Sequence, residues 1–171
     1  MSSTPLPDPG SRLLALYDRA LPQVYGYVRA RVGSTSTAED LTSETFLAAV
    51  AAINRGTVPD LTTAWLITVA RNKLVDHWRR EAREERSLTL VEHDDATSDE
   101  FDEKIERARA HEVLEELGAH HRAALTLRYL DGLSVPEVAQ HLDRTVHATE
   151  ALLVRARRAF RARYTEGSCD E

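Results

Sequence analysis

Apolar residues recur at three- and four-residue steps through most of this chain, and no stretch alternates apolar and polar residues as a half-buried strand would. This spacing is typical of one face of an amphipathic helix. The first such run has the apolar members Leu13, Leu16, Tyr17, Leu21, Val24 and Val28. Pro22 lies inside that run and lacks a backbone donor, which predicts a kink or a fresh helix start there. The pattern as a whole predicts an all-α fold.

Two more helices are expected before residue 87. Thr37, with Asp40 three residues later, is typical of a helix N-cap with an acid at N3 and predicts a helix to about Ile53. A loop at 54–60 follows, and then a third helix at about 61–86. The buried side of this third helix is expected to carry Ile67, Ala70, Leu74 and Trp78. Trp65 is also expected in the core.

The chain is predicted to divide into two domains at an acidic segment. Residues 87–110 hold three basic and eight acidic side chains, and helical spacing is lost over most of this stretch, which is a linker composition. Helical spacing returns with Val113, Leu114 and Leu117. We therefore expect two small helical domains joined by a flexible linker and flanked by disordered ends. The predicted bounds are 1–10 for the leader, 11–86 and 106–164 for the domains, 87–105 for the linker and 165–171 for the tail.

Charge and composition exclude some classes of protein. The formal net charge of the 171 residues is −6, but most of it lies in the acidic segment, and residues 155–163 hold five arginines and no acid. Local charge density decides polyanion binding, so nucleic-acid binding is permitted. No run approaches the ~20 apolar residues of a membrane-spanning helix, and the N-terminus lacks the features of a secretory signal. With Cys169 as the single cysteine, we expect a soluble, cytoplasmic protein without disulfides or membrane insertion.

Residues 134–160 have the pattern of a helix-turn-helix. Ser134 and Glu137 match the S-x-x-E capping box, and Thr145 can cap the second helix. Asp143 occupies the turn position that often holds glycine, where Asp tolerates a left-handed backbone better than most residues do. The expected inner residues are Val135, Val138, Ala139 and Leu142 on the first helix and Thr149, Leu152, Leu153, Ala156 and Phe160 on the second. In this motif the second helix enters the DNA major groove, although a helical hairpin of any all-α protein shows similar apolar stripes.

No catalytic or metal-binding arrangement accompanies these helices in the sequence. His111 and Glu112 lack the second histidine that would complete a zinc-binding HExxH motif. The adjacent His120 and His121 point apart on a helix, and the acidic segment lacks the ligand spacing of an EF-hand. The sequence therefore predicts a protein that is not an enzyme and that binds no cofactor and no metal.

Two separate stretches resemble one protein family. Residues 38–46 read AEDLTSETF and are followed by AWL at 64–66, ARN at 70–72, Asp76 and Arg79-Arg80; these resemble region 2 of the extracytoplasmic-function (ECF) class of bacterial sigma factors. LRY at 127–129, GLS at 132–134, EVA at 137–139 and RAR at 155–157 resemble region 4 of the same class. The resemblance covers about 11–86 and 106–164, with both regions in the family's order.

The resemblance implies a subunit that binds core RNA polymerase, through its β and β′ subunits, and directs transcription initiation at promoters. The residues it assigns to polymerase binding are Asp40, Leu41, Glu44 and Phe46. Those assigned to the minus-10 element, with the loop at 55–60, are Arg55, Arg71, Asn72, Asp76, Arg79 and Arg80. Those assigned to the minus-35 element are Arg144, Thr145, His147, Ala148, Glu150, Ala151, Arg155, Arg157 and Arg158. An anti-sigma factor is a further implied partner.

The recognition helix departs from the family's usual sequence. Glu150 stands where a lysine is common and Leu152 where an arginine is common, which implies an atypical minus-35 preference. Ser43 replaces a usual glutamine in the polymerase-binding segment. The alternative function is a helix-turn-helix regulator that binds duplex DNA without engaging core polymerase. That alternative explains residues 134–160 and leaves the segments at 38–46 and 64–80 without a role.

Overall fold

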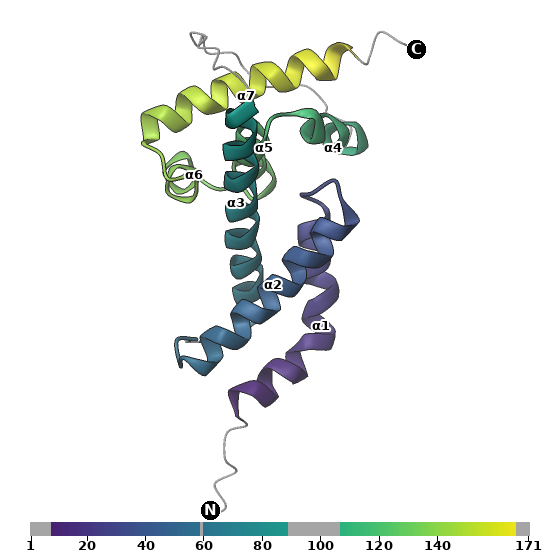
Figure 1. Cartoon of the computed structure of the whole chain (residues 1–171), viewed down its shortest axis with the longest axis vertical. Helices are drawn as coiled ribbons and strands as arrows, with labels where there is room; N and C mark the ends of the chain where they lie inside the picture. Colours follow the sequence, from purple (N-terminus) through teal and green to yellow (C-terminus); the bar gives the residue numbers. More distant parts are fainter. Residues whose placement is uncertain (1–7, 59, 89–106, 167–171) are drawn as a thin grey trace, which may run out of the picture. The chain divides into compact units, whose positions relative to one another are not determined.

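The computed structural model describes residues 8–58, 60–88 and 107–166, and within these ranges it contains helices and no strand (Figure 1). The all-α prediction is confirmed. The elements in chain order are α1 (Pro9–Arg29), α2 (Thr35–Asn54), α3 (Thr63–Leu88), α4 (Arg107–Glu116), α5 (Ala119–Leu125), the π-helix η1 (Thr126–Leu130), α6 (Val135–Leu142) and α7 (Val146–Glu166). Most of the predicted linker, and Cys169, lie outside the described residues.

The chain divides into two compact units within α3, after Leu74. The sequence predicts instead a first domain that extends to residue 86. The difference arises because the C-terminal part of α3, although continuous with the rest of the helix, has contacts with α5 and α6. Glu85, for example, accepts hydrogen bonds from the Ala119 backbone N–H with both carboxylate oxygens, at 3.0 and 3.1 Å. This carboxylate satisfies a backbone donor at the start of α5, where Gly118 offers no side-chain cap.

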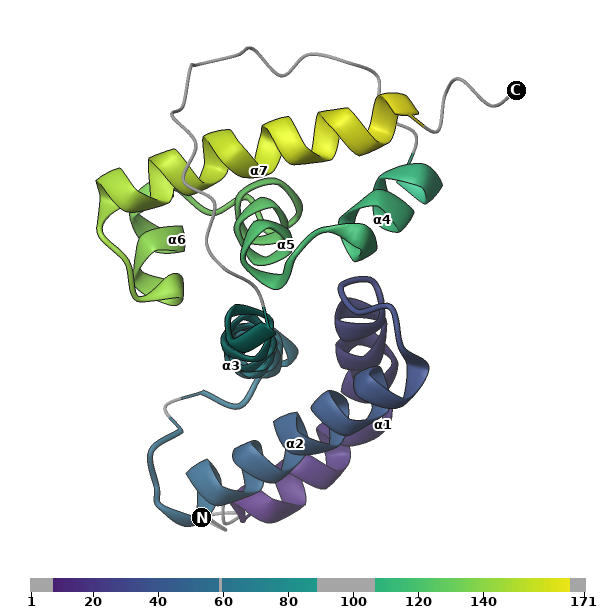
Figure 2. The same ribbon diagram turned by 45° about the horizontal axis from the view of Figure 1, so that its top comes forward.

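The first unit is built on α1 and α2, which lie side by side as a hairpin (Figures 1 and 2). Small and branched side chains allow the helices to approach closely, and the N-terminal part of α3 adds further buried residues. The fully buried residues are Ala20, Val24, Val28, Ala38, Thr45, Ala49, Leu66, Ala70 and Leu74. Thr45 satisfies its buried hydroxyl by donating to the Leu41 carbonyl oxygen at 2.7 Å.

Two predicted helix boundaries in this unit need correction. The N-cap of α2 is Ser34 and not Thr37, because the Ser34 hydroxyl accepts from the Thr37 backbone N–H at 3.4 Å. Local sequence could not choose within the run Ser34 to Thr37, since each of these residues is a good cap. α1 begins at Pro9, inside the predicted leader, where a proline lacks only a donor that would be unpaired anyway. No fresh helix starts at Pro22, which lies inside a continuous α1.

The buried face of α3 also differs from the predicted one at its start. Leu66 is fully buried, whereas Ile67 is only half-buried. Ala70, Leu74 and Trp78 are buried as predicted, so only the first member of the stripe differs: Leu66, one turn before Ala70, takes the inner position. Trp65 is half-buried. Thr62 caps the helix through its hydroxyl, which accepts from the Trp65 backbone N–H at 3.1 Å.

In the second unit α7 packs against α4, α5 and α6 (Figure 2). The π-helix η1 packs against α5 and α6. α5 is short and rich in alanine, so the long α7 can cross it closely. The buried residues of this unit include Leu117, Ala123, Ala124, Leu127, Val138, Leu152, Ala156 and Phe160. This core fixes the helix-turn-helix, because both of its helices contribute their apolar stripes to it.

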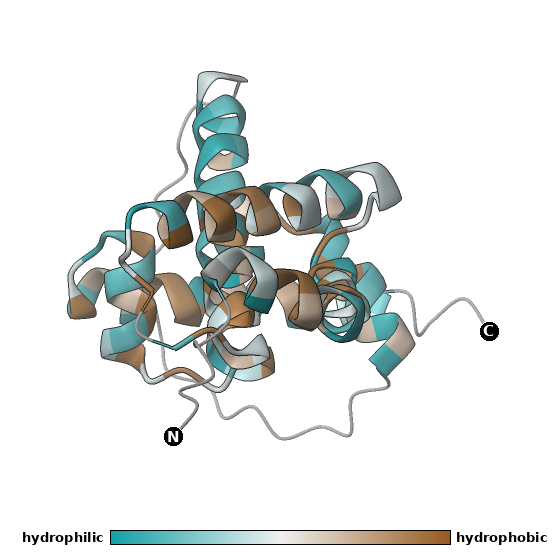
Figure 3. Ribbon diagram, turned by 90° about the horizontal axis from the view of Figure 1, so that it is seen from below, coloured by the Kyte–Doolittle hydropathy of each residue, from teal (hydrophilic) through white to brown (hydrophobic). Residues whose placement is uncertain are grey.

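Polar residues interrupt the apolar ones along the helices, as the teal and brown segments of the ribbon show (Figure 3). None of the helices in the described ranges combines the length and the apolar character needed to cross a membrane.

Candidate nucleic-acid and polymerase interface

The first helix of the predicted helix-turn-helix begins with a complete capping box. The Ser134 hydroxyl accepts from the Glu137 backbone N–H at 3.4 Å, and the Glu137 carboxylate accepts from the Ser134 backbone N–H at 2.7 Å. α6 therefore has a fixed start although it is only 8 residues long. Val138, Ala139 and Leu142 are buried as predicted, while Val135 is half-buried.

The turn between α6 and α7 depends on Asp143. This residue has φ 52° and ψ 52°, and it is the one non-glycine residue with positive φ in the described part of the chain. The Arg144 backbone N–H then donates to the Ala139 carbonyl oxygen at 2.9 Å, which closes the end of α6. Thr145 starts the next helix, because its hydroxyl accepts from the Ala148 backbone N–H at 3.1 Å. Both turn predictions are confirmed.

Asp143→Gly should raise the free energy of unfolding by ~0.5 kcal/mol, because glycine adopts the left-handed backbone without a Cβ clash. Asp143→Val should lower it by ~1–2 kcal/mol, since a β-branched side chain opposes this conformation. Urea denaturation of the three proteins measures both effects. Equal stability of the valine and glycine variants would contradict a strained left-handed turn.

α7 separates a buried face from a polar face, as predicted. Thr149, Leu152, Leu153, Ala156 and Phe160 are all buried. On the opposite face the His147 side chain is 96% exposed, and its Nδ1 lies 4.0 Å from a Glu150 carboxylate oxygen. Among the other predicted minus-35 residues, Arg158 is exposed and Ala148 and Ala151 are half-buried. Leu152 stands where an arginine is common in the family. Because Leu152 is a core residue, this difference does not leave an apolar side chain on the surface.

Some arginines of the predicted minus-35 set already have intramolecular contacts. Arg144 is half-buried, and burial together with the charges of Arg86 and Arg155 lowers its pKa. Arg157 donates from Nη1 to the Tyr129 hydroxyl at 3.2 Å. Arg157 is therefore held by a neighbouring hydroxyl, whereas Arg144 lies close to other cations.

The predicted minus-10 residues are divided between the loop before α3 and the surface of α3. Arg55 caps the end of α2 and is exposed, next to Gly56 with φ 66°. On α3, Asn72, Asp76 and Arg80 are exposed and Arg71 is half-buried. Arg79 differs from these, because its guanidinium donates to the His141 backbone oxygen within the second unit.

The predicted polymerase-binding residues on α2 do not share one environment. Asp40 is exposed, and Glu44 is half-buried with its carboxylate 3.6 Å from the Lys73 ammonium of α3. Leu41 is 2% exposed and Phe46 is 9% exposed, with the Phe46 ring edge-on to Tyr17 at 4.9 Å between centroids. Leu41 and Phe46 thus support the helix from its inner side, and their direct contact with polymerase stays a prediction.

Two apolar residues that the sequence analysis missed lie on the outer face of α2. Leu47 is 68% exposed and Val50 is also exposed, in helical register with Asp40 and Ser43. A signal for them exists in the sequence: steps of three and four residues from Asp40 give an outer stripe, opposite the alanine- and threonine-rich buried stripe. On α1, Leu14 and Tyr17 are further exposed apolar residues of the first unit.

Comparison with known proteins decides the family. Residues 16–84 match sigma-70 region 2 and residues 107–160 match sigma-70 region 4. The chain is 31% identical over 152 residues to the ECF RNA polymerase sigma factor SigL of Mycobacterium tuberculosis, covering 86% of this chain and 85% of SigL. This chain belongs to the ECF class of RNA polymerase sigma factors. The predicted family is confirmed, and with it the general function of directing transcription.

This sigma factor is also similar to a second ECF sigma factor and to a solved sigma factor structure. It is 37% identical over 151 residues to the ECF RNA polymerase sigma factor BldN of Streptomyces coelicolor, covering 85% of this chain but only 57% of BldN. Its fold is similar to that of sigma factor RpoE in a co-crystal structure with the anti-sigma factor NepR from Bartonella quintana. The TM-score is 0.53 at 20% identity, over 88% of this chain and 95% of the other.

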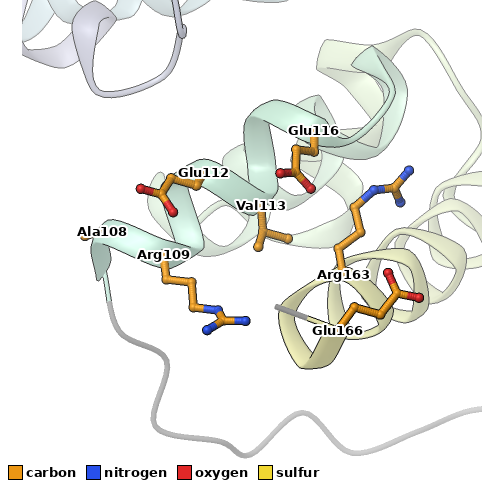
Figure 4. Close-up of a pocket in the computed structure, with 7 residues that line it drawn as sticks. All are labelled: Ala108, Arg109, Glu112, Val113, Glu116, Arg163 and Glu166. Carbon is orange, nitrogen blue, oxygen red and sulfur yellow. The ribbon is translucent and has the colours of Figure 1, made fainter. Parts of the chain in front are cut away.

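A pocket in the second unit of the sigma factor lies apart from all predicted site residues. It is lined by α4 and the end of α7, and charged side chains of both signs surround Val113 (Figure 4). Arg109 donates from Nη2 to the Tyr164 backbone oxygen at 2.5 Å, and its guanidinium lies 4.9 Å from the centre of the Tyr164 ring. These contacts join α4 to α7 and account for Arg109 structurally.

The sigma factor should lose stability as the pH falls from about 6.5 toward 4, because of His120. Burial, with Arg144, Arg86 and His121 nearby, lowers the His120 pKa from 6.5 to about 4. Arg86 Nη2 lies 2.7 Å from His120 Nε2, which must accept because a guanidinium cannot. The unfolded chain therefore binds a proton near pH 6.5 and the folded chain does not.

We expect the loss to be ~1 kcal/mol after allowance for the solvent exposure of this histidine. Urea denaturation at pH 7.5 and pH 5 measures it, with His120→Gln as the comparison. The difference between the two pH values should be smaller in His120→Gln. An unchanged difference would show that other groups cause the pH dependence.

Proposed function

We propose that this sigma factor binds core RNA polymerase, in the cytoplasm, through the outer face of α2. Asp40, Ser43, Leu47 and Val50 define that face. A partner could bury the exposed Leu47 and Val50 side chains against its own apolar residues. It could at the same time pair a basic side chain with the Asp40 carboxylate. Leu41 and Phe46 hold this face in place from the core. The exposure of Leu47 is the observation that carries this part of the proposal.

The minus-10 element would be bound by the loop that contains Arg55 and by the outer surface of α3. A melted strand requires neutralised phosphates and polar groups that can receive an unstacked base. Arg71 and Arg80 supply positive charge, while Asn72 and Asp76 supply hydrogen-bonding groups. Arg79 would join them only after it leaves the His141 carbonyl oxygen.

The minus-35 element would be read by the start of α7. His147 and Glu150 are exposed within its first two turns, where a recognition helix reaches base edges. A Glu150 carboxylate can accept from a cytosine amino group but repels phosphate. We expect phosphate contacts from Arg144, Arg155, Arg157 and Arg158. The small side chains of Thr145, Ala148 and Ala151 would allow α7 to lie close to the DNA. The two promoter-binding domains would extend over 11–86 and 106–164.

Reconstitution with core polymerase tests the proposal. Run-off transcription from the promoter of the protein's own gene should yield specific transcripts that Asp40→Ala and Asn72→Ala strongly reduce, with unchanged circular dichroism. Asp40→Ala should fail in polymerase binding, whereas Asn72→Ala should bind polymerase and fail in promoter opening. Binding to duplex DNA without any engagement of core polymerase would instead favour the helix-turn-helix regulator.

An anti-sigma factor is a further proposed partner. The exposed apolar stripe of α2 supports it, because a surface needed for polymerase binding must otherwise face water in the free protein. The fold is shared with RpoE, which was crystallised with the anti-sigma factor NepR. A purified anti-sigma candidate that competes with core polymerase, and that loses affinity for Leu47→Asp, would support this partner. Simultaneous binding of both would exclude a shared surface.

A further inference from the structure

Tyr129 lies in the π-helix η1, next to the helix-turn-helix, and is 46% exposed. A π-helix of this kind is rare and often occurs at functional sites. Its wide turn is closed by the Asp131 backbone N–H, which donates to the Thr126 carbonyl oxygen at 3.0 Å. Tyr129 belongs to the LRY motif at 127–129 but to none of the predicted binding sets.

Two arginines from different elements contact this tyrosine. Arg157 of α7 donates from Nη1 to the Tyr129 hydroxyl at 3.2 Å. The Arg128 guanidinium lies 5.8 Å from the centre of the Tyr129 ring, and its Nη1 donates to the Leu133 carbonyl oxygen at 2.9 Å. One aromatic side chain thus connects two cations, one through its hydroxyl and one through its ring.

Each arginine keeps hydrogen-bonding capacity in this arrangement. A guanidinium has five N–H donors, and the contacts above use only part of them. Holding a long side chain in one geometry before binding removes part of the entropy cost that a loose arginine would pay on contact with a phosphate. Glu150 lies on α7 two turns before Arg157, so these two side chains lie on the same side of the helix.

We propose that Tyr129 is a positioning residue that holds Arg157 and Arg128 as a pair of phosphate-binding cations at the edge of the minus-35 element. This inference rests on the proposed minus-35 function of α7. The ligand is a phosphate of the DNA backbone and not a base, because Arg157 lies about three turns beyond the start of α7. Arg157 should depend on the tyrosine hydroxyl, and Arg128 on the ring.

The test uses the holoenzyme and a fluorescent promoter fragment that contains the minus-35 element, titrated over a range of salt concentrations. Arg157→Ala should weaken binding by about tenfold and reduce the slope of log affinity against log salt by about one. Tyr129→Phe, which keeps the ring, should weaken binding about threefold and show no further effect in the Arg157→Ala background. Tyr164→Phe is the matched control and should leave the slope unchanged.

Additive effects of Tyr129→Phe and Arg157→Ala, or an unchanged salt slope in Arg157→Ala, would overturn the positioning role. Thermal unfolding of each variant separates this result from a loss of folding, because Tyr129→Phe should not lower the melting temperature. If the wild-type holoenzyme showed no affinity for the minus-35 element, the proposed function of α7 itself would fail. A wild-type holoenzyme that binds, with additive variants, would refute only the role of Tyr129.

Discussion

Leu47→Asp should weaken binding of this sigma factor to core RNA polymerase by roughly 30-fold or more while leaving its unfolding unchanged. Leu47 is 68% exposed on α2, so its replacement removes almost no core packing. An apolar residue at the centre of an interface contributes a large share of the binding energy, and a buried unpaired carboxylate adds a desolvation cost. Fluorescence anisotropy of labelled protein against increasing polymerase concentrations measures the affinity.

Leu47→Met is the matched control, because methionine keeps the apolar volume and should bind within about twofold of the original. Leu130→Asp places the same charge at an exposed leucine of the second unit, outside the α2 face. Unchanged polymerase affinity in Leu47→Asp would remove the outer face of α2 from the polymerase interface. Equal losses in Leu47→Asp and Leu130→Asp would show a general effect of charge.

Phe46→Ala should lower the free energy of unfolding of the first unit by ~3–4 kcal/mol. The ring is 9% exposed and lies edge-on to Tyr17, so truncation leaves a cavity between α1 and α2 and removes an aromatic pair. Such a loss is a large part of the total stability of a small domain. Urea denaturation followed by circular dichroism measures it, and polymerase binding should fall only as far as the folded fraction falls.

Phe46→Leu separates packing from contact at this position. Leucine fills most of the cavity, so this variant should regain much of the lost stability and bind polymerase as the original does. If Phe46 touched the polymerase, Phe46→Leu would lose affinity at nearly unchanged stability. That outcome would restore the role that the family resemblance gives to Phe46.

Local sequence chemistry was sufficient for the helix-turn-helix. Ser134 with Glu137, Asp143 and Thr145 each act through backbone groups within a few residues, so their roles could be predicted without knowledge of the fold. The buried face of α7 was also predicted in full, because a helix with one apolar stripe has only one way to face a core. The N-cap of α2 could not be predicted in this way, because each of the four adjacent serines and threonines at 34–37 can cap a helix.

The sequence by itself determined the helical fold, the motif order that identifies the family and the turn chemistry, because these depend on periodicity and on neighbouring residues. The tertiary structure decided which residues of a motif reach the surface. Asp40 and Leu41 are adjacent in the same motif, yet one is exposed and the other buried, because the packing of α2 selects the side of the helix that meets the core. The pairing of Tyr129 with Arg157 likewise joins residues distant in sequence, and only the packing of α7 within the second unit places them at 3.2 Å.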